Sequence, residues 1–148
     1  MGTAKEYMES VRAAQQLIDG ARARLSSMRV REGLRGCGYA SVGSGGGARD
    51  AMAATDARID AERRLDREMA GYTAEVDAGR AVCAGVRAAN RSLPLWADAL
   101  ELYYCDGLTW QAAAAALGVS VRSAQDARNQ ALDWVDSRGI AAVREMAG

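Results

Sequence analysis

Apolar residues recur at alternating steps of three and four along the first thirty residues, and this spacing restricts the segment to a long helix with one narrow apolar stripe. Thr3 is placed to cap the first turn, and Glu6 three residues later completes a capping box. So narrow a stripe needs a single partner helix, from this chain or from a second copy; the alternative is a helix lying on an ordinary globular core. The stripe consists of Ala4, Tyr7, Val11, Ala14, Ile18, Ala21, Leu25 and Met28.

The rest of the chain favours an all-α fold, because it holds one proline in 148 residues and no β-branched runs. A second helix is predicted from about residue 50 to about residue 90, although Gly71, Gly79 and Gly85 each disfavour a helix interior by roughly 1 kcal/mol and permit a break. We expect the two helices to form an antiparallel, coiled-coil-like hairpin and to assemble as a homodimer, because their Ala-rich stripes bury little in a monomer. The second stripe consists of Met52, Ile59, Leu65, Met69, Tyr72, Val76, Val82 and Val86.

A Gly/Ser-rich stretch at residues 33–48 predicts a flexible loop between these helices, since glycine loses the most entropy on ordering. It does not have the pattern of a phosphate-binding loop, because Ala48 and Arg49 follow it where a lysine is required and a helix precedes it. The predicted organisation is a helical hairpin or oligomerisation region at 1–92 and a second domain at 93–148.

The second domain has the layout of a helix-turn-helix. Pro94 suits the first turn of a helix, and Gly107 suits the left-handed position after its end. Thr109 can cap a short helix that ends at Leu117, and Ser120 can cap a longer one that runs to about residue 136. Gly118 permits the tight turn between them, so the second helix is held at an angle that lets it enter a major groove. The tail at 139–148 predicts a short extra helix, which either covers this module or frays.

The last helix sorts its residues by face. Ala124, Ala127, Ala131, Leu132 and Val135 fall on one side and predict the packed face. Side chains that can read base edges fall on the other side, with arginine suited to guanine, glutamine or asparagine to adenine, and aspartate to cytosine. These candidate DNA-binding residues are Arg122, Ser123, Gln125, Asp126 and Asn129.

The run LELYYCDGLTWQAAAAALGVSVRSAQDARNQALDWVD, from about Leu100 to Asp136, resembles the fourth region of bacterial sigma factors. The wider layout, with AKEYMES near its start and a Gly/Ser-rich stretch before a long helix, is similar to phage regulators of the ArpU kind. The resemblance implies control of phage transcription, with DNA contacts at Val121, Arg122, Gln125 and Asp126 and with Thr109 and Ser120 near phosphates. The chain departs from the family pattern at Ala112, where an acidic residue is usual, and in its few basic residues.

Charge and composition limit the other function classes. The chain holds 19 basic and 19 acidic residues, and residues 94–148 hold four Arg against seven Asp and Glu, a formal charge of −3. This balance disfavours tight non-specific DNA binding, which depends on neutralised phosphates. The chain has no histidine, and acidic pairs such as Asp60 and Glu62 read as solvated charges, so we expect no enzyme, metal site or cofactor.

Cellular context is predicted from the cysteines and from hydropathy. Cys37, Cys83 and Cys105 are odd in number and widely spaced, which indicates free buried thiols. No signal-peptide pattern or membrane-spanning run occurs, so we expect a cytoplasmic protein without membrane contact.

Three hypotheses follow. The first is a phage or prophage transcriptional regulator that is a homodimer and reads the major groove of double-stranded DNA with the helix at 121–136. The second is a small terminase-like subunit for DNA packaging, which a ring of many copies would indicate. The third is a protein-interaction module that binds RNA polymerase through the acidic C-terminal region.

Overall fold

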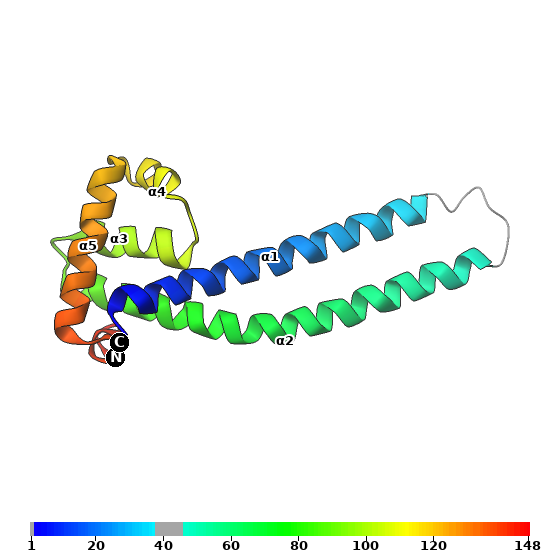
Figure 1. Cartoon of the computed structure of the whole chain (residues 1–148), viewed down its shortest axis with the longest axis horizontal. Coiled ribbons are helices and arrows are strands. Elements are labelled where there is room, and N and C mark those ends of the chain that lie inside the picture. Colours follow the sequence, from blue (N-terminus) through cyan, green and yellow to red (C-terminus); the bar gives the residue numbers. More distant parts are fainter. Residues whose placement is uncertain (1, 38–45) are drawn as a thin grey trace. The chain divides into compact units, whose positions relative to one another are not determined.

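The computed structural model describes residues 2–37 and 46–148, and this part is almost entirely helical. No strand occurs in these two ranges, which confirms the all-α prediction. None of the helices described has the length and apolarity needed to cross a membrane. In chain order they are α1 (Ala4–Cys37), α2 (Gly46–Ala89), α3 (Pro94–Leu100), the π-helical turn η2 (Glu101–Cys105), α4 (Trp110–Leu117), α5 (Val121–Arg138) and α6 (Ile140–Glu145) (Figure 1).

The chain forms two compact units. The smaller unit is Leu17–Gly71, and the larger unit combines Met1–Gln16 with Tyr72–Gly148. Residues near both ends of the chain therefore pack together in the larger unit. The division differs from the boundary expected between residues 92 and 93, because the first turns of α1 and the last turns of α2 pack with the C-terminal helices.

The smaller unit is a helical hairpin. Its segments of α1 and α2 run side by side in opposite directions, as predicted (Figure 1). Ile18, Ala21 and Leu25 of the α1 stripe are buried in it. Arg29 of α1 bonds Glu62 of α2 at 3.0 Å, and Arg58 bonds the same carboxylate at 2.8 Å. The hydrogen bond from Arg29 lowers the pKa of Glu62, which therefore serves as an ion-pair acceptor.

Three details of the hairpin differ from expectation. The predicted loop at 33–48 is shorter, since α1 continues to Cys37 and α2 starts at Gly46; residues 38–45 lie outside the described part. α2 is unbroken, although a break was permitted at its glycines. Met52 is 69% exposed and does not belong to the buried stripe of α2.

In the larger unit, the first turns of α1 pack against the last turns of α2. The capping box is present, because Thr3 Oγ1 accepts from the Glu6 amide at 3.2 Å and Glu6 Oε2 accepts from the Thr3 amide at 3.3 Å. Val11 contacts α2 so closely that a Cβ added at Gly79 would lie 2.6 Å from Val11 Cγ1. Met8, which lay outside the predicted stripe, is fully buried.

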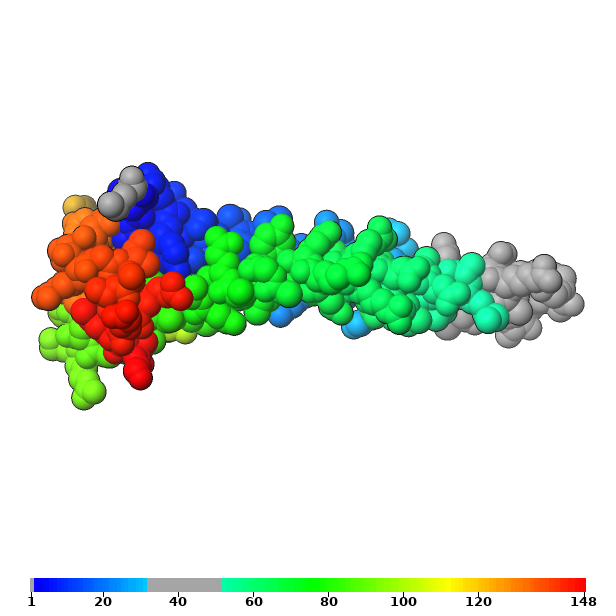
Figure 2. Space-filling view, turned by 90° about the horizontal axis from the view of Figure 1, so that it is seen from below, coloured from blue at the N-terminus to red at the C-terminus, as the bar shows by residue number. Residues whose placement is uncertain are grey.

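α6 covers the end of α2. Its Val143 is fully buried and lies against Gly85, while Met146, just after the helix, is 38% exposed. Figure 2 shows the red surface of α6 beside the green surface of α2. The predicted extra helix therefore exists, and it packs on α2 as well as on α5.

Candidate nucleic-acid interface

The candidate interface is built on α4, the turn after it and α5, and local sequence explains each boundary. Thr109 caps α4 by accepting from the Ala112 amide at 3.2 Å, and Ser120 caps α5 by accepting from the Ser123 amide at 3.1 Å. Each cap contributes about 1 kcal/mol. Gly118 adopts φ 68°, the left-handed conformation that ends α4 and starts the turn. The helix-turn-helix geometry expected from the sequence is therefore present.

The preceding segment also begins and ends as expected. Pro94 starts α3, and Gly107 has a φ of 72°. Between them the chain widens into the π-helical turn, where the Asp106 amide donates to the Glu101 carbonyl at 2.9 Å. The wider turn brings both Tyr104 and Cys105 into the core, which a simple α-helical pattern did not predict.

α5 packs one face against α3 and α4, and this fixes which face is open. Its predicted inner residues are all buried, at relative exposures of 5% or less. In a helix with about 100° between residues, the face opposite them is then turned outward. The inner residues are Ala124, Ala127, Ala131, Leu132 and Val135.

The structure brings seven of the eight candidate DNA contacts to the first half of α5 and its cap. Val121 and Gln125 are half-buried at the edge of the packed face, so only part of each side chain can reach a ligand. Thr109 is exposed at the start of α4, apart from the other seven in the chain. The remaining five are exposed: Ser120, Arg122, Ser123, Asp126 and Asn129.

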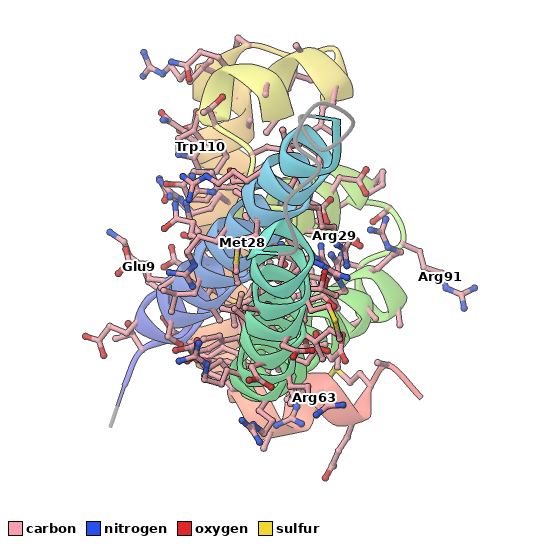
Figure 3. All side chains as sticks on the ribbon, turned by 90° about the vertical axis from the view of Figure 1, so that its right-hand side faces the viewer. Glu9, Met28, Arg29, Arg63, Arg91 and Trp110 are labelled. Atoms are coloured by element: carbon pink, nitrogen blue, oxygen red, sulfur yellow. The ribbon has the colours of Figure 1, made fainter. Side chains whose placement is uncertain are left out.

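An arginine–aromatic stack holds this module to α1. Tyr103 and Trp110 stack with ring centroids 4.0 Å apart and planes within 11°. Arg12 of α1 lies over Tyr103 at 3.9 Å, and Arg128 of α5 lies over Trp110 at 4.9 Å. Arg12 also donates to the carbonyls of Tyr103 and, at 2.9 Å, Leu108. Trp110, the first residue of α4, is labelled in Figure 3.

The stack accounts for the orientation of one of the two arginines in the first half of α5. Arg128 is half-buried and donates to the Tyr104 hydroxyl at 3.3 Å and to Asn129 Oδ1 at 2.6 Å. Burial raises the pKa of Tyr104, so the phenol stays neutral and serves as the acceptor. Arg128 therefore serves packing, and Arg122 is the exposed cation of the outer face of α5.

Ion pairs with α2 neutralise several acids of this region. Arg80 bonds Glu101 at 3.2 Å and Asp106 at 2.8 Å. Arg87 bonds Asp98 at 2.7 Å and Glu101 at 3.0 Å, and the hydrogen bond with Asp98 raises the pKa of Arg87. Adding these two arginines to the four in residues 94–148 gives six arginines against seven acids, a formal charge of −1. The formal charge of −3 therefore overstates the negative charge at the helix-turn-helix.

A shallow hollow borders the outer face of α5. Its first wall is residues 92–96, at the start of α3, and its second wall includes Ser123, Asp126 and Gln130 of α5. Trp96 Nε1 donates to Gln130 Oε1 at 3.2 Å and joins the two walls. The start of α3 is therefore a direct neighbour of the candidate DNA face, which the sequence did not reveal.

The cysteines form no metal centre in the part of the chain that the structure describes. Cys83 and Cys105 are buried with their sulfur atoms 3.9 Å apart, and both thiols are free. The side chain of Cys37 lies outside the described residues.

No family model, curated protein or solved structure matches this chain. The likeness to sigma-factor region four and to ArpU-type regulators therefore rests on the motif alone and stays a prediction. The DNA contacts implied by that likeness have the same standing.

Proposed function

We propose that this chain is a DNA-binding transcriptional regulator of phage or prophage origin, which inserts the first half of α5 into the major groove. One observation carries the proposal: a doubly capped helix-turn-helix presents Arg122, Ser123, Asp126 and Asn129 on one exposed side of its second helix. Hydrogen-bonding side chains at this position are the means by which such a module reads base edges.

The shape of the module also supports this function. The caps and the left-handed Gly118 fix the angle between α4 and α5, and the stack from Arg12 to Arg128 holds both helices against the first turns of α1. A recognition helix needs such rigid support, because base readout depends on side chains held within about 0.5 Å of the position from which they can bond.

The charges on α5 predict that one module binds a single DNA site weakly. The outer face of α5 carries Arg122 but also Asp126 and Asp133, so it neutralises few phosphates. Two linked modules would raise the affinity through effective concentration, which is the role we assign to a homodimer. From Ala4 to Leu25 the α1 stripe is already buried within the chain, except for the half-buried Tyr7, so that dimer would use other surfaces of the two long helices.

Fluorescence polarisation with a labelled random-sequence duplex tests the proposal. The full chain is compared with Arg122→Ala at about 50 mM and about 200 mM salt. Arg63→Ala is the matched control, since it removes an exposed arginine of the smaller unit. We expect binding that weakens steeply with salt, is reduced by Arg122→Ala and is unchanged by Arg63→Ala.

Other results would favour the protein-interaction or the DNA-packaging hypothesis. Absence of binding at about 50 mM salt would overturn the proposal and favour a module that binds RNA polymerase or another protein. A mass measurement distinguishes the two DNA-binding functions, because a dimer fits a regulator and a ring of many copies fits a packaging subunit.

A further inference from the structure

The proposed DNA-binding face of α5 carries little positive charge. Arg128 is turned toward Trp110 and Tyr104, so Arg122 is the exposed cation that the first half of α5 offers to a phosphate. Protein–DNA affinity depends on several neutralised phosphates. If α5 enters a groove, further cations must come from an element beside it.

The linker between α2 and α3, residues 90–93, lies beside the first half of α5. Ser92 and Leu93 of the linker line the hollow whose other wall includes Ser123 and Asp126 of α5. The major groove is about 12 Å wide and has a phosphate backbone along each side. An element that flanks the recognition helix on its open side therefore faces one of the two backbones.

The linker is held in a defined conformation. The Asn90 side chain donates to the Val86 carbonyl at 3.0 Å, and the Leu93 amide donates to the Asn90 carbonyl at 3.0 Å. Pro94 directly follows the linker and restricts the backbone at that point. A contact made from this linker would thus lose little backbone conformational entropy on binding, and the main ordering cost falls on the contacting side chain.

Arg91 projects from this linker into solvent. It makes no hydrogen bond or ion pair with any residue that the structure describes, and Figure 3 shows its side chain pointing away from the ribbon. The arginines of α2 in this unit differ from Arg91, because Arg80 and Arg87 are paired with acids. Figure 2 shows the yellow-green linker region standing out at the surface.

We infer that Arg91, with the hydroxyl of Ser92 beside it, binds the DNA backbone next to the groove that α5 enters. Asp126 lines the hollow and repels phosphate there, so the backbone lies outside the hollow, on the side of the linker that carries Arg91, and Asp126 faces the bases. The inference rests on the proposed function and adds a contact outside the helix-turn-helix.

The test compares the salt dependence of binding for the full chain, Arg91→Ala, Arg91→Lys and Arg144→Ala, with a labelled random-sequence duplex. Arg144→Ala is the matched control: it removes the same charge from α6, where Arg144 lines a different hollow with Ala81, Ala141 and Glu145. Loss of one phosphate contact lowers the slope of log K against log salt by about 0.9 and weakens binding roughly 15-fold at about 50 mM and fourfold at about 200 mM salt. Arg91→Lys should keep the slope.

The results distinguish failure of the linker contact from failure of the proposed DNA binding. A reduced slope in Arg91→Ala, with Arg144→Ala and Arg91→Lys close to the unmodified chain, supports the contact. Equal slopes for Arg91→Ala and Arg144→Ala, while the unmodified chain binds, overturn the linker contact and leave the proposed function standing. Failure of the unmodified chain to bind overturns both.

Discussion

Gly85 of α2 lies directly against the backbone carbonyl of Val143 in α6. A Cβ added at Gly85 would lie 1.9 Å from that oxygen, far closer than non-bonded atoms approach. The neighbour is backbone, so a change of rotamer cannot relieve the overlap. The glycines of α2 therefore permit close helix crossings at Gly79 and Gly85, and they do not mark breaks in the helix.

We expect Gly85→Ala to destabilise the chain by about 1–3 kcal/mol, the usual cost of overpacking a core. Gly71→Ala is the matched control, because that glycine is also inside α2 but a Cβ there would meet nothing within 4 Å. The control should stabilise the helix by about 0.5–1 kcal/mol. Circular dichroism melts would show opposite shifts in Tm, and equal shifts for the two variants would contradict the crossing.

Arg12 is expected to stabilise the helix-turn-helix through Tyr103. Arg12→Met removes the cation–π contact and the hydrogen bonds to the carbonyls of Tyr103 and Leu108, and we expect a loss of about 1–3 kcal/mol. Arg12→Lys keeps the charge but lacks the planar fork, so its loss should be smaller. Urea unfolding followed by tryptophan fluorescence measures both, since Trp110 is part of the stack. A midpoint for Arg12→Met equal to that of the unmodified chain would argue against this role.

The sequence predicted the parts of the fold that depend on neighbouring residues. The caps at Thr109 and Ser120 and the left-handed turn at Gly118 involve residues at most three apart, and each is present. The buried face of α5 was predicted as well, because helical periodicity alone determines which residues share a face.

Contacts between distant residues were not predicted, because no local pattern marks them. Arg12 and Tyr103 are 91 positions apart, and nothing near either residue reveals their stacking. The same holds for the ion pairs that turn Arg80 and Arg87 toward acids of α3 and η2. Met8 was missed because the start of α1 is covered on more than one side, as the 2.7 Å hydrogen bond from the Ala4 amide to Asp136 of α5 shows.

Cys83 lies beside Cys105 in the core of the larger unit. The hydrogen bond between the two thiols, followed by burial, raises the pKa of Cys83 well above its usual value. The thiolate is the reactive form of Cys83, and both thiols are buried, so both should react slowly with a disulfide reagent at about pH 8. In a Cys37→Ser background, we expect both to react quickly only after the chain is unfolded in denaturant. Fast reaction in the folded protein would contradict their burial.

The raised pKa also gives a dependence of stability on pH. A group with a raised pKa in the folded state contributes its full stability below its unfolded pKa and loses it as the pH rises toward the folded value. The contribution of Cys83 should therefore decline above about pH 8.5. We expect the difference in unfolding free energy between Cys37→Ser and Cys37→Ser/Cys83→Ala to narrow from about pH 7 to about pH 10. A constant difference would show that Cys83 ionises as readily in the folded chain as in the unfolded one.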